Sequence, residues 1–336
     1  MNLSGKRVLV TGGAGFIGSE LVRQLVESWA TVVVVDNLVN GRWQNLTGVP
    51  SGSARLVEAD IRDAVRMRDF LKSTDIVFHL ACLGVRHSIH SPLENHEVNA
   101  VGTLNVLSAA RDASVERFVY VSSSEVYGTA QSTPMNEQHA TFPKTIYGAS
   151  KLAGESFTRA FHDTYGLPAV VVRPFNSYGP RSHHEGDSGE VIPKFLLRCM
   201  AAMPMIIFGD GTQTRDFTYV GDTARGIIAV AMADVAVGKI VNVGSGLELS
   251  VNQLAREVGM LLEHPEPAIV HMEPRPGDVL RLCADTSLAR DLCGFETTMS
   301  LRDGLAKLKG WYELQGTPPE VLLRKETVRN WETKRV

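Results

Sequence analysis

The chain has 336 residues, of which 44% are hydrophobic, and this is enough apolar material for one large domain or two moderate ones. Its 34 basic and 37 acidic residues give a net charge of −3 without a basic stripe, which argues against nucleic acid or a membrane surface as a partner. The four cysteines form no Cys-x-x-Cys pair, and we expect them to be reduced thiols. The N-terminus lacks the pattern of a signal peptide, and no run of about 18 apolar residues occurs. We therefore expect a soluble, cytoplasmic protein.

The first half of the chain alternates short β-branched runs with longer helical patterns. The runs predicted to be strands are 7–12, 31–36, 54–60, 75–81, 117–123 and 168–174. The helical patterns between them include 16–28, 95–113 and 147–165. Nearly continuous Val, Ile and Leu is typical of strands that are covered on both faces. Repeated β-α units therefore predict an α/β fold with a doubly wound, parallel Rossmann sheet.

The second half of the chain changes character after residue 174. A loop rich in Gly, Pro, His and Asp is followed by a helical pattern over 194–203, and 239–245 is predicted to be a strand that rejoins the first sheet. Two further helical patterns lie between 249 and 336. We therefore expect a larger Rossmann domain of residues 1–174 plus about 216–247. A smaller, discontinuous α/β domain for the substrate would hold about 175–215 plus 248–336.

A glycine-rich turn, VTGGAGFIG, directly follows the first strand and opens the first helix. Gly12, Gly15 and Gly18 allow a tight turn and let a pyrophosphate approach main-chain N–H groups. Asp36 ends the second strand, where its carboxylate can accept from both hydroxyls of an adenosine ribose and would repel a 2′-phosphate. This pattern favours NAD over NADP as the cofactor, although the nearby Arg42 could offset the repulsion.

The third strand ends at another carboxylate, Asp60. Its side chain could accept from the amino group of adenine, with the backbone of Ile61 alongside, or it could serve as a helix N-cap. The remaining residues expected to line the dinucleotide site are Phe16, Ile17, Asn37, Leu80 and Ala81.

The motif YGASK places Tyr147 and Lys151 four residues apart near the start of a long helix, so both project from one face. A phenol with a pKa of about 10 is a poor acid–base catalyst at neutral pH. The ammonium of Lys151 and the positive nicotinamide ring of an oxidised cofactor would stabilise the phenolate. Tyr147 could then take a hydroxyl proton from a substrate as a hydride leaves the carbon, while Ser123 holds the oxygen in place.

Several motifs together resemble one known family: TGGAGFIG, ADIRD, HLAC, VNAVGT, SSSEVYG, YGASK and RPFNSYGP. The chain is similar over nearly its whole length to the extended short-chain dehydrogenases/reductases that modify nucleotide-diphosphate sugars. The resemblance implies NAD as cofactor, and Ser123, Tyr147 and Lys151 as the catalytic trio. It also implies that Asn99 supports the lysine through a backbone and a water, and that helices 95–113 and 147–165 pair in a homodimer. Cys82 stands where the family usually has alanine.

Glu125 distinguishes between the reactions of this family. We expect it to lie on the same side of an extended segment as Ser123. A 4-epimerase needs no second ionisable group, whereas a 4,6-dehydratase must remove the C5 proton next to a 4-keto group. Ser124, included among the expected catalytic residues, stands where some dehydratases carry an acid for C6. The sequence thus favours a 4,6-dehydratase, followed by a 4-epimerase of a UDP-hexose, hexosamine or glucuronate, and then by a UDP-glucuronate decarboxylase. The alternative role for Glu125 is that of a structural carboxylate. The alternative function for the whole protein is NAD binding without catalysis.

The resemblance also extends to the expected nucleotide-sugar site. The residues that match positions holding the diphosphate and the nucleotide ribose are Asn176, Arg215, Arg275 and Asp278, and Val191 matches the segment along the nucleobase. Arg86 could bind the carboxylate of a uronate.

A polar cluster in the loop of the second half comprises His183, His184, Glu185 and Asp187. Adjacent histidines cannot easily face one ion and the expected chemistry needs none, so we predict no metal site and interpret the segment as a loop bordering the sugar pocket.

Overall fold

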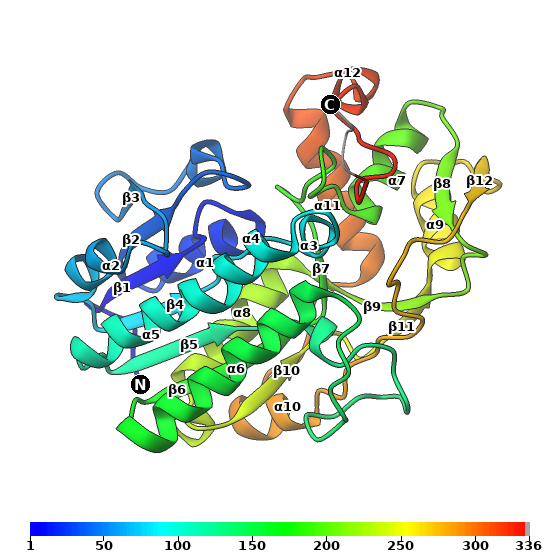
Figure 1. The fold of residues 1–336 in the computed structure, drawn as a ribbon. Helices are drawn as coiled ribbons and strands as arrows, with labels where there is room; N and C mark the ends of the chain where they lie inside the picture. Colours follow the sequence, from blue (N-terminus) through cyan, green and yellow to red (C-terminus); the bar gives the residue numbers. More distant parts are fainter. Residues whose placement is uncertain (333–336) are drawn as a thin grey trace.

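A seven-stranded parallel sheet forms the centre of the computed structural model, which describes residues 1–332. Its spatial order is β10-β6-β5-β4-β1-β2-β3 (Figure 1). The strands are β1 (Arg7–Thr11), β2 (Thr31–Asp36), β3 (Ala54–Glu58), β4 (Ile76–His79), β5 (Arg117–Val121), β6 (Ala169–Pro174) and β10 (Ile240–Val243). The predicted doubly wound sheet is confirmed, including the return of β10 to it, and the structure places β10 beside β6, where Val241 pairs with Val172.

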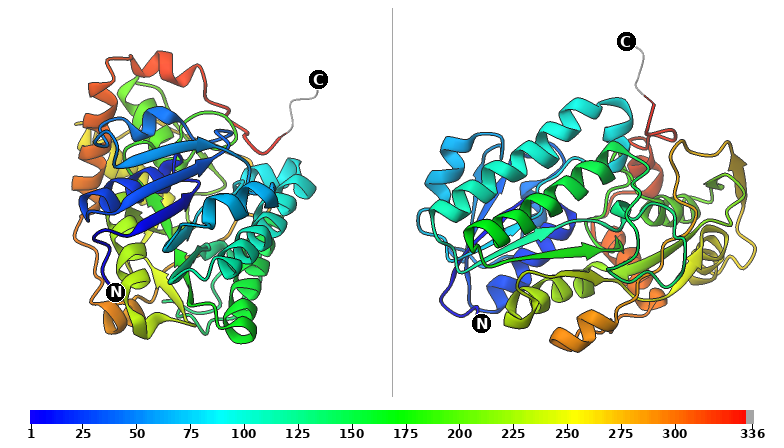
Figure 2. Two further views of the ribbon diagram at one scale, coloured as in Figure 1. Left: turned by 90° about the vertical axis from the view of Figure 1, so that its left-hand side faces the viewer. Right: turned by 60° about the horizontal axis from the view of Figure 1, so that its bottom comes forward.

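Helices cover both faces of this sheet (Figure 2, left). One face packs against α1 (Phe16–Glu27), α8 (Val220–Met232) and α10 (Ser287–Cys293). The other face packs against α2 (Ala64–Leu71), α5 (Thr103–Asp112) and α6 (Ile146–Tyr165). Most of the strands can carry nearly continuous apolar runs because helices keep water from both faces, whereas the edge strand β3 is only partly buried.

The single helix expected over 95–113 is interrupted in the structure. It consists of α4 (Pro92–His96), a π-helical segment (Glu97–Gly102) and α5, and it is preceded by α3 (Val85–His90). Single π-helical turns inside helices occur frequently at functional sites. This one contains Asn99, one of the residues selected from the sequence.

The smaller lobe has a core of its own. Its helices are α7 (Val191–Met200), α9 (Val251–Leu261), α11 (Leu301–Leu314) and α12 (Pro319–Leu323). Strand β8 (Met205–Phe208) pairs in parallel with β12 (Ile269–Met272). A three-stranded sheet of β11 (Glu248–Ser250), β9 (Thr214–Tyr219) and β7 (Asn176–Tyr178) lies between this lobe and the large sheet (Figure 1). The remaining short helices are Trp43–Leu46, Ser124–Val126 and Asp234–Ala236.

The C-terminal region differs from the expectation in one respect. Residues 249–332 contain four helices, not two, because α10 and α12 are too short to give a clear periodic pattern. The side chains of Ala289 and Phe295, in and just after α10, are buried in the core of the large sheet. We therefore propose that residues 287–295 belong with the larger domain, whereas the other domain boundaries stay a prediction.

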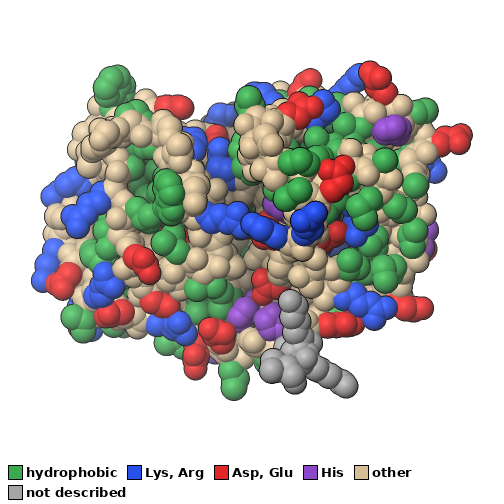
Figure 3. Space-filling view, turned by 90° about the horizontal axis from the view of Figure 1, so that it is seen from above, with side chains coloured by type: hydrophobic (Ala, Val, Ile, Leu, Met, Phe, Trp, Pro, Cys, Tyr) green, Lys and Arg blue, Asp and Glu red, His purple; other side chains and the backbone are tan. Residues whose placement is uncertain are grey.

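The carboxyl ends of the large sheet's strands face the smaller lobe, and the surface is hollowed between the two lobes when the molecule is seen from above (Figure 3). In open parallel α/β sheets, this edge is where ligands bind. Within residues 1–332, no helix combines the length and the apolar character that a membrane span requires.

Candidate active site

A cavity of about 480 Å³ opens at the carboxyl edge of the sheet, between the two lobes. Most residues selected from the sequence line it together. Those from the dinucleotide side are Gly12, Gly15, Phe16, Ile17, Gly18, Asp36, Asn37, Ile61, Leu80 and Ala81. Those from the catalytic and sugar sides are Arg86, Ser123, Ser124, Glu125, Tyr147, Lys151, Asn176, Val191, Arg215, Arg275 and Asp278. Asp60 and Asn99 do not line the cavity. The roles assigned to these residues stay predictions.

The glycine-rich turn leaves room for a ligand against the start of α1. Gly12 has a φ of +70°, and a Cβ there would lie 2.7 Å from the backbone nitrogen of Ala81. A Cβ at Gly18 would lie 2.1 Å from the carbonyl oxygen of Gly12. No side chain caps the N-terminus of α1, so its first N–H groups are available to an anion. This cradle fits the pyrophosphate of a dinucleotide.

Asp36 is held at the adjacent end of β2. Its carboxylate accepts 2.9 Å hydrogen bonds from the backbone N–H groups of Ala14 and Leu38, and burial raises its pKa. An ionised carboxylate offers about four acceptor positions, so two remain for ribose hydroxyls. Arg42, which left NADP open in the sequence analysis, is engaged by Glu185 in an ion pair. The geometry thus fits NAD.

The Asp60 side chain is occupied by protein partners. Arg62 pairs with it at 2.8 Å and Asn37 donates to it at 3.2 Å, and the hydrogen bond from Arg62 lowers the pKa of Asp60 to about 2. The alternative role as a helix cap was wrong, because Asp63 caps α2. Only the neighbouring Ile61 reaches the cavity, so a contact of the Asp60 carboxylate with adenine stays a prediction.

Tyr147 and Lys151 lie in the first two turns of α6. The Lys151 ammonium is buried, donates a 2.9 Å hydrogen bond to the carbonyl oxygen of Val121, and lies 6.0 Å from the centre of the Tyr147 ring. Ser123 lies two residues after the end of β5 and lines the same cavity. The pair selected from the sequence is therefore positioned as expected, with its lysine fixed by the end of β5.

In the protein alone the pKa of Tyr147 is raised, and the acidification expected from Lys151 together with an oxidised nicotinamide ring stays a prediction. Burial raises this pKa well above the ordinary value, and Cys82, Glu125 and Glu190 raise it further, whereas a hydrogen bond with Ser123 lowers it. The protein's own groups therefore do not acidify the phenol. Further positive charge is needed, which an oxidised nicotinamide ring supplies.

Asn99 has a different contact from the one expected. Its side-chain amide makes two hydrogen bonds with the backbone of Leu83, accepting from the N–H at 2.8 Å and donating to the carbonyl at 2.9 Å. It thereby fixes the segment after β4, next to Ala81 and Cys82 in the cavity wall. A link from Asn99 to Lys151 stays a prediction.

Glu125 does not lie in an extended segment, so the argument from strand alternation was wrong. Residues Ser124–Val126 form a 3₁₀ turn that is capped by Ser123, whose hydroxyl accepts from the Glu125 N–H at 3.2 Å. The turn packs closely on α6 at Gly148, where an added Cβ would lie 2.7 Å from the Glu125 carbonyl oxygen. Glu125 nevertheless lines the cavity, and so does the buried Ser124.

Three arginines surround the Glu125 carboxyl. Burial raises its pKa, and the positive charges of Arg215, Arg275 and Arg86 oppose that rise. Of these, Arg215 and Arg275 both donate to one oxygen of Asp278, at 2.7 and 2.5 Å. This cationic group suits an anion such as a diphosphate.

Asn176 has a buried side-chain oxygen that finds no partner among residues 1–332. The side-chain amide of Asn carries an acceptor oxygen and a donor nitrogen. Either atom could therefore occupy this unpaired position and hydrogen-bond a ligand there. It lines the same cavity as the arginines. The observation fits the expected role of Asn176 in holding the substrate.

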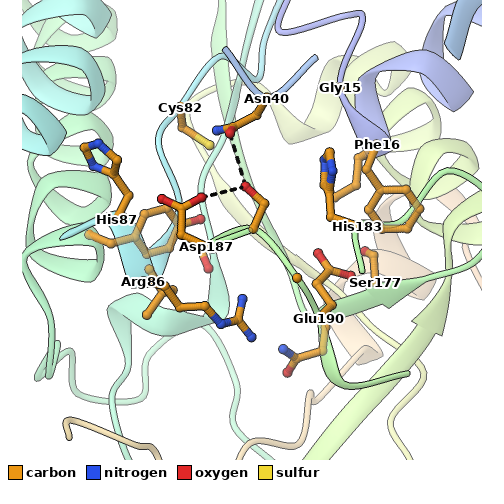
Figure 4. A pocket seen from close by; sticks show the side chains of 18 of the residues that line it. Gly15, Phe16, Asn40, Cys82, Arg86, His87, Ser177, His183, Asp187 and Glu190 are labelled. Carbon is orange, nitrogen blue, oxygen red and sulfur yellow. Dashed lines mark hydrogen bonds between the residues drawn. The ribbon is translucent and has the colours of Figure 1, made fainter. Parts of the chain in front are cut away.

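Two further residues of the cavity wall were missed by the sequence analysis. Glu190 directly precedes α7, and Lys194 lies one turn along that helix. Figure 4 shows the side chains of Glu190 and Arg86 projecting into the same part of the cavity from opposite walls. Glu190 directly precedes Val191, which the resemblance did select, so its place beside a selected residue is the signal that could have found it.

The loop with adjacent histidines closes one side of the cavity. Ser188 donates to Asn40 at 3.1 Å and to Asp187 at 3.4 Å (Figure 4), and Asp187 in turn contacts His90 at 3.2 Å. The loop thus connects the segment after β2 with α3. Among residues 1–332, no three His, Cys, Asp or Glu side chains are arranged to hold a metal ion.

Comparison with known proteins agrees with this geometry. A family model described as the NAD dependent epimerase/dehydratase family matches residues 8–244. A putative UDP-glucose 4-epimerase of Methanocaldococcus jannaschii is 36% identical over 311 residues, which are 90% of this chain and 97% of the relative. Relatives of comparable similarity are named dTDP-glucose 4,6-dehydratase or UDP-glucuronic acid decarboxylase.

Solved structures give the same result. The epimerase Mth375 of Methanothermobacter thermautotrophicus has a TM-score of 0.89 and 36% identity, covering 96% of this chain and 95% of its own. DesIV of Streptomyces venezuelae, a dTDP-glucose 4,6-dehydratase solved with NAD and TYD bound, has a TM-score of 0.86 and 34% identity, with coverages of 92% and 97%.

Proposed function

This chain belongs to the NAD dependent epimerase/dehydratase family, and we propose that it is a 4,6-dehydratase that removes water from a nucleotide-diphosphate sugar through a transient 4-keto intermediate. Its cofactor is NAD. The observation that carries the specific proposal is the position of the Glu125 carboxyl, which lies in the cavity wall beside Ser123 and close to Tyr147. Oxidation at C4 alone requires no such group.

The first half of the reaction falls to the residues around Tyr147. Its phenol oxygen takes the proton of the C4 hydroxyl, and Ser123 orients that hydroxyl by a hydrogen bond. NAD, when bound, accepts the hydride from C4 and contributes the positive charge that the buried phenol lacks. Lys151, fixed by the carbonyl of Val121, adds its own positive charge near the Tyr147 ring.

The second half uses Glu125. A ketone at C4 makes the proton on C5 acidic, so a carboxylate within reach can remove it. Burial raises the pKa of Glu125, which makes its carboxylate a stronger base, while the surrounding arginines keep the ionised form accessible. Arg215, Arg275 and Asn176 would hold the diphosphate at the other end of the substrate.

A nucleotide-sugar 4-epimerase is the second candidate. Two relatives, each 36% identical to this chain, are named UDP-glucose 4-epimerase, one of them as putative. In addition, Ser124 beside Glu125 is an alcohol at the position where some dehydratases carry an acid. A UDP-glucuronate decarboxylase is disfavoured electrostatically, because Glu190 and Glu125 would both face the carboxylate of a uronate, with Arg86 as the opposing charge.

We also propose an oligomeric state for the protein. We expect a homodimer through α5 and α6. Apolar side chains exposed beside or on these helices support it, and they are Val101, Ile146 and Tyr165. Light scattering after size-exclusion chromatography measures the mass directly, and a monomer at micromolar concentration would remove this part of the proposal.

The proposed reaction is tested by incubating the purified protein with UDP-, dTDP-, GDP- and CDP-sugars in deuterated water. Loss of one water with deuterium at C5 supports dehydration, unchanged mass with inversion at C4 supports epimerisation, and loss of carbon dioxide supports decarboxylation. Glu125→Gln should abolish both deuterium incorporation and water loss. The matched control is Glu58→Gln, at an exposed position outside the cavity.

A further inference from the structure

Glu190, like Glu125, brings a carboxyl without an ion-pair partner among residues 1–332 into the lining of the catalytic cavity. It comes from the end of the loop 183–190, where α7 begins, whereas Glu125 comes from the turn after β5. Among residues 1–332, the Glu190 side chain makes no hydrogen bond and no ion pair, and it does not cap α7. The Arg86 guanidinium, which projects into the same space, also lacks both kinds of contact within these residues (Figure 4).

Glu190 and Glu125 act on the same neighbours from different walls. The charges of both carboxyls raise the pKa of Tyr147, and both also act on Arg86. The space where a sugar would meet the Tyr147 hydroxyl is therefore flanked by two carboxyls. Neither carboxyl is committed to a structural ion pair.

The surroundings of Glu190 keep its proton available near neutral pH. Burial raises its pKa to about 7, with Glu185 acting in the same direction and His183 and Arg86 opposing. The groups that face it from other elements are Arg86 of α3, Tyr147 of α6 and Tyr312 of α11. An acid–base group is most effective when its pKa lies close to the working pH.

Elimination of water requires such a proton. Hydroxide is a poor leaving group, so the C6 hydroxyl must be protonated as its bond to carbon breaks. In the proposed reaction, Glu125 is engaged as the base for C5 and Tyr147 as the base for C4. Ser124 offers only an alcohol, which is a much weaker acid than a carboxyl. The other carboxyls in the cavity lining already have protein partners: Asp36 accepts from backbone N–H groups, Asp187 contacts His90, Asp278 pairs with two arginines and Glu326 pairs with Arg198. Glu190 is therefore the carboxyl that remains for this step.

We propose that Glu190 is the general acid for the group leaving C6, an assignment that rests on the proposed 4,6-dehydration. The C5–H bond breaks and its proton bonds to the Glu125 carboxylate, while the electron pair forms a C5=C6 double bond. The C6–O bond breaks as its oxygen takes the proton of Glu190 and departs as water. Glu125 gains one proton and Glu190 loses one, so the summed charge of the two carboxyls is unchanged.

The test compares two leaving groups. Wild type and Glu190→Gln are assayed with the same panel of UDP-, dTDP-, GDP- and CDP-sugars. The one that the wild type dehydrates is then assayed as its 6-deoxy-6-fluoro analogue. Fluoride leaves carbon with far less need of a proton than hydroxide does. Glu190→Gln should therefore lose about 10²–10⁴-fold in water release, yet release fluoride at close to the wild-type rate. Glu190→Asp, which keeps a carboxyl, should recover part of the water release.

The outcomes separate the two proposals. If the wild type releases water and Glu190→Gln matches it, or if the variant slows water and fluoride release equally, Glu190 is not the acid, and the proposed dehydration stands. If the wild type releases water from none of the UDP-, dTDP-, GDP- and CDP-sugars, the proposed function falls and this assignment falls with it. Circular dichroism and NAD affinity of Glu190→Gln should equal those of the wild type, because Gln preserves the shape of the side chain.

Discussion

Arg173 and Glu155 form a buried ion pair behind the catalytic end of β5. Their closest nitrogen and oxygen are 2.6 Å apart, and the two side chains are 3% and 2% exposed. The same carboxylate accepts a 2.5 Å hydrogen bond from the hydroxyl of Ser122, the residue before Ser123. Glu155 lies one turn after Lys151 in α6. One buried carboxylate thus ties α6 to β5 and β6 where the proposed catalytic residues meet.

The first prediction concerns this ion pair. Arg173→Met should lower the free energy of unfolding by about 3–5 kcal/mol, because it leaves the Glu155 carboxylate buried without its partner. Urea denaturation followed by circular dichroism measures the change. The control is Lys309→Gln, which removes a 2.6 Å pair with Glu313 whose side chains are 34% and 51% exposed, and which should cost at most about 1 kcal/mol. Equal losses in the two variants would contradict the importance of the buried pair.

The second prediction compares two glycines. Gly18→Ala should weaken NAD binding by roughly 100-fold, since the added Cβ would lie 2.1 Å from the Gly12 carbonyl oxygen and force the phosphate-binding turn apart. Gly310→Ala adds a Cβ in α11 with no atom within 4 Å, so it should leave NAD binding unchanged and stabilise the protein by about 0.5–1 kcal/mol. Isothermal titration and thermal unfolding measure the two effects. Tight NAD binding by Gly18→Ala would mean that this turn does not contact the cofactor.

Much of the fold was predictable because most of its strands carry nearly continuous apolar runs. Strands β1, β2 and β6 consist largely of Val and Leu, and that pattern requires helices on both faces. The pattern of Lys239 to Ser245 also predicted that β10 rejoins the large sheet from far along the chain, although not which strand it pairs with. Short helices such as α10 escaped prediction, since seven residues give barely two turns of periodicity.

The chemistry of individual side chains was less predictable, because it depends on partners brought in by the fold. The ion pair of Asp60 with Arg62 and the 3₁₀ turn at Glu125 each involve residues close together in the sequence. They were still not predictable, because the same few residues can adopt several backbone conformations. The raised pKa of Tyr147 and the position of Glu190 are non-local. They arise only once α3, α6 and α7 enclose one cavity, which no spacing in the sequence encodes.

The third prediction is a pH dependence of stability. The pKa of Glu190 is raised from 4.5 to about 7, so the folded state holds this proton more tightly than the unfolded state does. The stability it contributes is fully present below about pH 4.5 and is lost as the pH rises to about 7. The free energy of unfolding of the wild type minus that of Glu190→Gln should therefore fall over this window and be flat above it. A rising difference would mean that Glu190 is stabilised as the carboxylate.

The fourth prediction separates the substrate site from the cofactor site. Arg215→Met should raise KM for the nucleotide sugar by roughly 10–100-fold, because it removes a charged donor beside Asp278 and Arg275, each such hydrogen bond being worth about 1.5–3 kcal/mol. NAD affinity should stay unchanged. Arg281→Gln, at an exposed arginine paired with Glu248 at 2.7 Å, is the matched control and should alter neither constant. A loss of NAD affinity in Arg215→Met would place the cofactor, not the sugar nucleotide, against this arginine.

The fifth prediction concerns the protonation of Tyr147. In the NAD-free protein its phenol should titrate well above its ordinary pKa, because burial and the carboxyls of Glu125 and Glu190 disfavour the phenolate. Adding oxidised NAD should lower that pKa, and reduced NAD, which lacks the positive ring, should lower it much less. The phenolate absorbance of the wild type minus that of Tyr147→Phe measures the titration.

Tyr147→Phe should also reduce turnover by about 10²–10⁴-fold, the usual contribution of a positioned acid–base group, while it keeps NAD affinity. Tyr165→Phe, at the other end of α6 with its ring 55% exposed, is the control and should retain full activity. A low pKa of Tyr147 without NAD would show that Lys151 suffices to form the phenolate. In that case, the charge of the cofactor would not be needed to start the reaction, and the proton of the C4 hydroxyl could be removed before the hydride is transferred.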